Sequence, residues 1–394
     1  MTAPAVDLQP HGDREVRLLI ECARALVEPD RAERIRQLAG AGLNWDRLLT
    51  LAHRNGLAPL LCRHLNKICA TSVPADKLGS LRDYFQKNSA FGLLLTGELI
   101  RLLKVLNDNG ISAVPYKGPA LAVKLYGHGA LRQFCDLDIL VRESDVWAAS
   151  GVIEAQGFVP DIPIPEKKRE AFVRRDYVRL FHRDAGRTLV ELHWGIAPRY
   201  FAVQFEAEAV WPRLEPMALQ GATVFMPCPE DLLIMLSVHG ARHSWDKLEG
   251  VCSLAELLRR AQNMDWARVW QRSREMHCRR MVLFGLLLAH GLFDVPLPPQ
   301  AAIGRSPRLL ALARDVVRHF SADVVQPRTL SRVALHLRLK DSYTDRIRHC
   351  AGQALTATPV DWATMPPLGP LAFAYPLWRA VRLTRKYGLN HERG

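Results

Sequence analysis

The chain has 394 residues, of which 48% are hydrophobic and 24% charged, so it can bury a large core and is not an intrinsically disordered protein. Its formal charge of +13 and isoelectric point near 9.6 favour polyanionic ligands such as nucleotides, nucleic acid or an acidic membrane face. Because the basic residues are spread along the chain, an anionic substrate is favoured over a dedicated DNA-binding arm.

The eight cysteines form no CxxC pair, and their spacing indicates neither a zinc ribbon nor a disulfide framework. We expect reduced thiols, most of them buried. The segment from Met1 to Arg17 lacks the apolar core of a signal peptide, and no apolar run reaches the roughly 20 residues needed to span a bilayer. A cytoplasmic location is therefore expected.

The first part of the chain has the pattern of helices. Apolar residues recur at three- and four-residue spacing in the segments 14–26, 44–65 and 81–106. Asn44 is a predicted N-cap for the second helix, because its side-chain oxygen can accept from a backbone N–H of the first turn. The pattern predicts a helical N-terminal subdomain over residues 1–109.

The pattern then changes to alternating strands and helices. A strand is predicted over Ile111–Tyr116, a helix over 120–127, a strand over 133–141, a helix over 143–157 and a short strand at Phe158. The segments 175–183 and 187–196 flank Asp-Ala-Gly and predict a β-hairpin. We expect this mixed module to occupy residues 110–228.

Residues 229–394 are predicted to form a helical C-terminal subdomain. Its clearest helical segments are 230–245, 248–261 and 264–276, and Ser306 and Pro307 fit the N-cap and first positions of another helix. The tail, residues 366–388, is apolar and then basic. Packing on the core as a terminal helix is favoured for it, and contact with a membrane surface or a protein partner is the alternative.

Two acidic residues lie inside the otherwise apolar predicted strand 133–141. Side chains alternate along a strand, so Asp136 and Asp138 project from one face while Leu137 and its odd-numbered neighbours project from the other. A third acid, Glu191, lies on the second strand of the predicted hairpin, on the same face as His193.

Three neighbouring carboxylates repel one another unless a cation lies between them. Divalent ions such as Mg²⁺ bind carboxylate oxygens and keep sites for phosphate oxygens, and a pair of ions can stabilise both oxygens of an in-line phosphoryl displacement. The alternative is structural: Asp136 and Asp138 would lie at an exposed strand end and pair with arginines such as Arg132.

The residues around the two acids carry a resemblance to a known family. A Lys117-Gly118 turn, Tyr126 at a helix end, Arg132 before the strand "DLDILV", and a closing Gly157-Phe158 follow in this order. The stretch resembles the nucleotidyltransferase superfamily of the DNA polymerase β type, and more narrowly the bacterial group of nucleotidyltransferase family proteins. The likeness extends over most of residues 40–265, including "LVELHWGI" and "VHGARHSWDKLEGVCSLAELL".

The resemblance implies an α+β fold, with a polymerase β-like core of a small mixed sheet and flanking helices between helical N-terminal and C-terminal subdomains. Two positions depart from the family pattern. Gly118-Pro119 replaces a Gly-Ser turn whose hydroxyl would hold a phosphate, so Lys117 and backbone N–H groups have to provide more of that contact. Ser253 stands where an Asp is expected, which puts the role of that position in doubt.

The resemblance and the residue chemistry together assign roles. Asp136 and Asp138 are expected to bind Mg²⁺ or Mn²⁺, with Glu191 as the third ligand or as the general base for the attacking hydroxyl. His193 is expected to support the site rather than to act in the chemistry. The residues expected to contact the nucleotide are Lys117, Gly118, Arg132, His239 and His243. For the two last histidines, which lie four apart on one helix face, a metal pair or a purely structural role stays open.

The leading hypothesis is a metal-dependent enzyme that moves a nucleoside monophosphate from an NTP, with ATP expected, to a hydroxyl or phosphate of an unidentified small molecule, peptide or protein. Pyrophosphate would be released. The alternative is a noncatalytic or regulatory protein of the same fold that binds a partner, as in a toxin-antitoxin-like pair. A nucleic-acid polymerase or an enzyme acting on tRNA ends also fits the charge. The sequence contains no Walker A, G-x-S-x-G or H-E-x-x-H motif.

Overall fold

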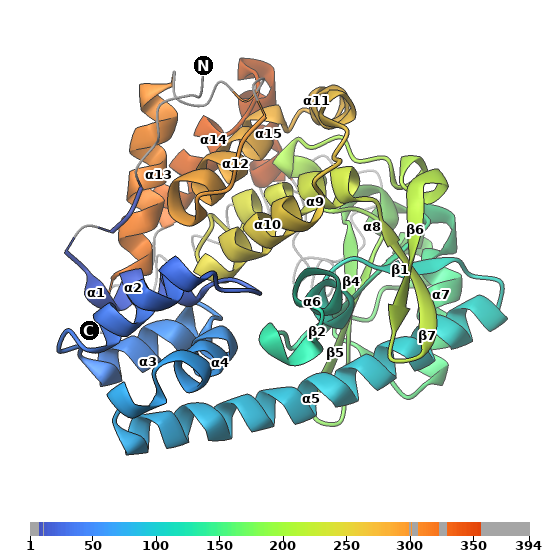
Figure 1. Cartoon of the computed structure of the whole chain (residues 1–394). Helices are drawn as coiled ribbons and strands as arrows, with labels where there is room; N and C mark the ends of the chain where they lie inside the picture. Colours follow the sequence, from blue (N-terminus) through green and yellow to red (C-terminus); the bar gives the residue numbers. More distant parts are fainter. Residues whose placement is uncertain (1–7, 11, 299–300, 302–305, 323–328, 356–394) are drawn as a thin grey trace, which may run out of the picture.

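A computed structural model of the chain describes residues 8–10, 12–298, 301, 306–322 and 329–355. The tail, residues 366–388, lies outside the described residues. The described part contains helices on both sides of a mixed sheet, so the predicted α+β class is confirmed (Figure 1). None of the described helices combines the length and apolar composition that crossing a bilayer would require.

Five α-helices of the described part precede β1: α1 Arg14–Cys22, α2 Pro29–Ala39, α3 Trp45–Arg54, α4 Ala58–Ile68 and α5 Ala75–Asp108. Asn44 caps α3 as predicted, since its side chain accepts from the backbone N–H of Arg47. The prediction of a single helix over 44–65 is wrong, because the helix is interrupted between α3 and α4. Gly56 has φ +72°, a left-handed conformation that ends a helix, and α4 begins at Ala58 with Pro59 as its second residue.

The main sheet has five strands in the order β1-β2-β5-β4-β3: β1 Ala113–Pro115, β2 Asp136–Val141, β3 Val159–Pro160, β4 Val178–Arg183 and β5 Thr188–His193. β4 and β5 form the predicted hairpin, and β2 pairs with β5 in parallel. The helices within this module are α6 Gly118–Tyr126, α7 Val146–Ala155 and α8 Arg169–Arg175. A two-stranded sheet, β6 Leu214–Leu219 and β7 Ala222–Pro227, follows.

The remaining described helices are α9 Pro229–Arg242, α10 Leu248–Arg260, α11 Trp266–Glu275, α12 Arg279–Phe293, α13 Pro307–Phe320, α14 Thr329–Arg338 and α15 Tyr343–Leu355. Ser306 and Pro307 take the predicted N-cap and first positions of α13, although the Ser306 side chain makes no capping bond. Figure 1 shows α5 running along one edge of the molecule, from the N-terminal helices to the sheet, with α9 and α10 between the two regions.

The two faces of the sheet contact different hydrophobic clusters. Leu137, Ile139 and Val190 belong to a cluster that includes residues of α5 and α7. Leu140, on the other face of β2, belongs to a cluster formed mainly by α1–α4, α9, α10 and α12. The alternation predicted for β2 is therefore confirmed, and its acidic residues lie on the same face as Leu140.

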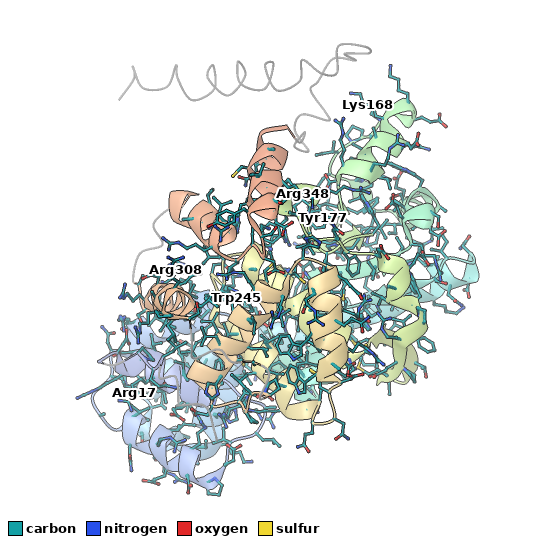
Figure 2. The ribbon with its side chains drawn as sticks, turned by 90° about the horizontal axis from the view of Figure 1, so that it is seen from above. Arg17, Lys168, Tyr177, Trp245, Arg308 and Arg348 are labelled. Carbon is teal, nitrogen blue, oxygen red and sulfur yellow. The ribbon has the colours of Figure 1, made fainter. Side chains whose placement is uncertain are left out.

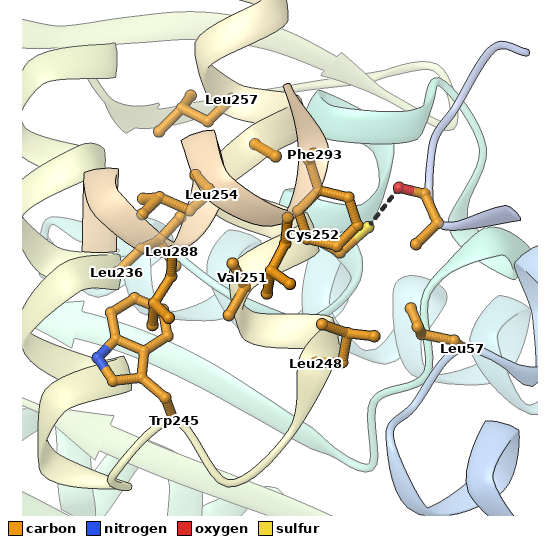
Figure 3. Close-up of a cluster of buried hydrophobic side chains, with 14 of the residues drawn as sticks. Leu57, Leu236, Trp245, Leu248, Val251, Cys252, Leu254, Leu257, Leu288 and Phe293 are labelled. Atoms are coloured by element: carbon orange, nitrogen blue, oxygen red, sulfur yellow. Dashed lines mark hydrogen bonds between the residues drawn. The ribbon is translucent and has the colours of Figure 1, made fainter. Parts of the chain in front are cut away.

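The second cluster joins segments that are far apart in the sequence. Figure 3 shows Leu57 near Leu248 of α10, while Trp245 packs among leucines of α9, α10 and α12. The Cys252 thiol donates to the carbonyl of Ala23 at 3.2 Å. This packing fixes α9 and α10 over the acidic face of the sheet. None of the eight cysteines forms a disulfide, and six are buried.

Candidate functional site

The register of the parallel strands brings the acids together. Asp138 of β2 lies directly opposite Glu191 of β5, and Leu140 lies opposite His193. Because residues two apart share a face, Asp138, Glu191 and His193 all project to the side covered by α9 and α10. Metal-binding atoms of these three side chains lie within 4.8 Å of one another. The sequence predicted only a supporting role for His193, although its position two residues after Glu191 places it on the same face of the strand.

The two carboxylates are neutralised by a lysine and a histidine. Lys117, at the N-cap of α6, donates to Asp138 Oδ1. His193 Nε2 lies 3.2 Å from the same oxygen and 3.1 Å from Glu191 Oε2, so it donates to both carboxylates. Asp138 and His193 are each 1% exposed, which makes this a buried charge cluster rather than an exposed strand end.

The charges shift one another's protonation. Burial would raise the pKa of Asp138, but Lys117 and His193 hold it well below its usual value. The same balance lowers the pKa of Glu191, where the His193 hydrogen bond outweighs burial. Burial would lower the pKa of His193, but its bonds to the two carboxylates raise it. The imidazole therefore favours its protonated form in this arrangement.

Asp136 lies at the start of β2 and lines the same cavity as Asp138, but it is not one of the three clustered residues. Burial and the neighbouring Asp138 charge raise its pKa to about 6. Ionising the Asp136 carboxyl is therefore unfavourable, and the attraction of Lys117 and Arg132 only partly compensates for this. A bound cation would make ionisation more favourable.

Gly118 sets the distance between the Lys117 turn and β2. Its φ is +57°, in the left-handed region, and a Cβ at this position would lie 3.0 Å from the carbonyl oxygen of Asp136. Pro119 is the second residue of α6, where a missing N–H breaks no helical hydrogen bond. The Gly-Pro pair therefore lets the N-terminus of α6 lie directly against the acidic strand.

Arg132 does not pair with the strand acids. Its Nε donates to Glu249 at 2.6 Å, and the Ser253 hydroxyl donates to the same carboxylate oxygen at 2.6 Å. The alternative in which Arg132 ties up Asp136 and Asp138 is therefore wrong. The departure at Ser253 has a structural explanation, because its hydroxyl orients Glu249 against Arg132.

These residues line a cavity of about 470 Å³ between the sheet and α9 and α10. Its charged lining residues are Lys117, Arg132, Arg242, Lys247, Asp136, Asp138, Glu191, Asp246 and Glu249. His239 and His243 lie on the wall opposite the strands, with ring centroids 4.5 Å apart. Burial, together with neighbouring cations, lowers the pKa of His239 well below its usual value and that of His243 to about 3, so both rings are neutral.

A divalent cation fits the donor set of the cluster. Asp138 Oδ2 is buried and has no hydrogen-bond partner among the described residues. Two carboxylates and an imidazole offer the oxygen and nitrogen ligands that Mg²⁺ or Mn²⁺ accept, and the cluster is negatively charged once His193 loses its proton. His239 and His243 belong to no such group among the described residues, so the metal-pair alternative for them has no support from the geometry.

Comparison with known protein families shows to which family the chain belongs. The profile of a family described as "uncharacterised nucleotidyltransferase" matches residues 41–294. The chain belongs to this family. The matched range contains the Lys117-Gly118 turn, the strands β2 and β5, and the helices α9 and α10 that close the cavity. No curated protein and no solved structure matches the chain significantly.

Proposed function

We propose that this nucleotidyltransferase-family protein moves a nucleoside monophosphate from an NTP, with ATP as the expected donor, to a hydroxyl or phosphate of an acceptor and releases pyrophosphate. The observation that carries the proposal is the buried group of Asp138, Glu191 and His193 on adjacent parallel strands, beside a cavity lined by lysines and arginines. An acidic group of this kind, next to cationic side chains, suits a metal-bound triphosphate better than a neutral ligand.

In the proposed site, Asp138 and Glu191 hold the metal ion, with His193 completing the set and Asp136 available from the same cavity wall. When bound, Mg²⁺ or Mn²⁺ supplies positive charge to the triphosphate and the attacking oxygen. Asp138 pairs with Lys117, and a bound ion would interact with the same carboxylate. Glu191, 27% exposed, is accessible enough to take the acceptor proton if it does not serve as a ligand.

The remaining walls of the cavity suit the other parts of a nucleotide. Lys117 and Lys247 are the lysines of the lining and can contact phosphate oxygens, while Gly118 keeps the backbone of the turn close to β2. Arg132 is held by Glu249, so its proposed contact with the triphosphate is through a fixed guanidinium. Neutral His239 and His243 present aromatic rings that can contact a nucleobase without adding charge.

The test is binding of Mg-ATP, measured by titration calorimetry, to the parent protein and to the double variant Asp136→Asn/Asp138→Asn. We expect the double variant to lose binding by at least about 100-fold, because the metal ion would lose two anionic partners. Asp246→Asn is the matched control, since it removes one charge from the lining of the same cavity away from the cluster. Unchanged affinity in the double variant would reject the assignment.

A second measurement addresses the acceptor. The purified protein is incubated with each labelled NTP, with Mg²⁺ or Mn²⁺ and with host extract, and the labelled product is identified. Label transfer by the parent, but not by the double variant, supports an enzyme. Mg-ATP binding with no transfer to any component of the extract would favour the alternative of a regulatory protein that keeps the fold.

A further inference from the structure

A second cavity, of about 700 Å³, lies at the carboxyl edge of the parallel strands. Glu143, which follows β2, and Trp194 and Gly195, which follow β5, are among its lining residues. Open α/β sheets bind ligands at this edge of parallel strands. Its volume lies within the range of sites for small-molecule ligands.

One side chain, Tyr177, lines both cavities. Its ring centroid lies 6.0 Å from that of His193, and its hydroxyl accepts from Arg242 at 2.7 Å. A Cβ on Gly195 would lie 3.0 Å from the Tyr177 Cβ, so glycine lets the chain leave β5 close against this tyrosine. Tyr177 is thus the one lining residue that the two cavities share, and its ring contacts His193 of the cluster.

The outer wall of the second cavity comes partly from outside the range matched by the family. Arg348 of α15 is a lining residue, and Figure 2 shows it close to Tyr177. Its neighbour His349 donates through Nδ1 to the carbonyl of Tyr200 at 2.9 Å, which fixes α15 on the loop that supplies Arg199 and Val203 to the same cavity. Arg348 and the contact of α15 with Tyr200 therefore involve a helix outside the residues that the family profile matches.

The charge of the second cavity is opposite to that of the whole protein. Its lining contains four acids and two arginines: Glu143, Asp176, Glu206, Glu208, Arg199 and Arg348. It has two cationic residues where the first cavity has four, and it lacks the Asp138, Glu191 and His193 group that could hold a metal ion, so a triphosphate is less favoured there than in the first cavity.

Two of the four acids have cationic partners. Glu208 pairs with Arg142 at 3.0 Å, and Glu143 lies 3.9 Å from Arg199. Asp176 and Glu206 form no ion pair with any residue that the structure describes. The second cavity therefore offers two carboxylates that a cationic ligand could use.

The surroundings of Asp176 favour a nearby cation. Its carboxylate accepts from the backbone N–H of Tyr177 at 2.9 Å, but burial raises its pKa to about 6. A cation placed beside it would offset the cost of burying the charge. Apolar side chains, including Trp194, Val203 and Phe205, complete the lining and suit the carbon skeleton of an organic ligand.

We propose that the second cavity binds the acceptor and that the acceptor is a hydroxyl-bearing organic cation, held by Asp176 and Glu206 with its hydroxyl directed past Tyr177. This inference rests on the proposed nucleotidyl transfer. In the reaction, the acceptor oxygen forms a bond to the α-phosphorus while the bond from that phosphorus to the bridging oxygen breaks. Pyrophosphate leaves with the electron pair, and the hydroxyl proton passes to Glu191 or to solvent.

The experiment compares three probes of similar skeleton: serinol, a cation; glycerol, which is neutral; and glycerate, an anion. Each is added at the same concentration to the protein with Mg²⁺ and α-labelled ATP, and the labelled adduct is quantified. We expect serinol to react about tenfold faster than the other two, because only its ammonium group can pair with the acids of the second cavity.

The double variant Asp176→Asn/Glu206→Gln tests the residues. It should lower the serinol rate about tenfold while leaving the glycerol rate and Mg-ATP affinity unchanged. Asp83→Asn, an exposed site on α5, is the control for loss of surface charge and should change none of these values. Retained Mg-ATP affinity also shows that the double variant is folded.

Equal rates with the three probes, zero included, would overturn the inference, as would a serinol rate that the double variant leaves unchanged. In either case Mg-ATP binding by the parent, lost in Asp136→Asn/Asp138→Asn, would leave the proposed nucleotidyl transfer standing. Failure of the parent to bind Mg-ATP would instead reject the proposed function itself.

Discussion

The ion pair between Lys117 and Asp138 should make a large contribution to the free energy of unfolding. Their side chains are 7% and 1% exposed, so neither charge is appreciably solvated if the other is removed. Removing one partner of a buried pair costs about 3–5 kcal/mol, because the remaining charge stays buried without its partner. We therefore expect Asp138→Asn to lower the free energy of unfolding by this amount. Lys117→Met should cost less, since His193 still donates to Asp138.

The coupling between the two residues can be isolated in a double-mutant cycle. In Lys117→Met/Asp138→Asn neither buried charge of the pair remains, so the combined cost should fall short of the sum of the single costs by about 1–3 kcal/mol. The measurement is urea unfolding followed by tryptophan fluorescence in metal-free buffer. Additive costs would refute the reasoning, because they would show that the two charges do not depend on each other.

A divalent cation should distinguish the two single variants. At a concentration of Mn²⁺ or Mg²⁺ about 100 times the dissociation constant, binding adds about 2.7 kcal/mol to the stability of a protein that retains the site. Lys117→Met keeps Asp138, Glu191 and His193 and should gain this stability, whereas Asp138→Asn should gain little. Equal gains in both variants would mean that the ion binds elsewhere.

Three further predictions concern single positions. Glu191→Gln should lower the rate of labelled transfer at least about 100-fold while circular dichroism shows an intact fold; unaltered turnover would exclude it from the site. Gly118→Ala should destabilise the protein by about 1–3 kcal/mol, measured by urea unfolding, because its Cβ would meet the Asp136 carbonyl at a left-handed φ; no loss would contradict this geometry. Burial lowers the pKa of Lys340 to about 7 from 10.5, so the unfolded chain binds a proton that the folded chain lacks between these values. The free energy of unfolding should then rise by about 1.4 kcal/mol per pH unit across this window. Urea midpoints measured near pH 8 and pH 9 should rise less in Lys340→Met than in the parent. Equal rises in both proteins would exclude Lys340 as the cause.

The local chemistry of the site was predictable because it depends on short-range spacing. Alternation along a strand determined that Asp136 and Asp138 share one face and that Glu191 shares its face with His193. The cap at Asn44 and the β4–β5 hairpin were predictable for the same reason, since each depends on a few consecutive residues. The break between α3 and α4 was missed because helical periodicity continues across Gly56, whose left-handed backbone only the structure records.

The sequence by itself determined the residue types of the site, the order of its strands and helices, and the faces on which the acids lie. Only the tertiary structure decided which of those residues meet. The parallel register of β2 and β5 places Glu191 beside Asp138, although about 50 residues of chain separate them. The packing of α10 places Glu249 next to Arg132, which therefore pairs with Glu249 instead of with the strand acids. Contacts of this kind depend on how separate elements pack, and the spacing of residues along one element carries no information about them.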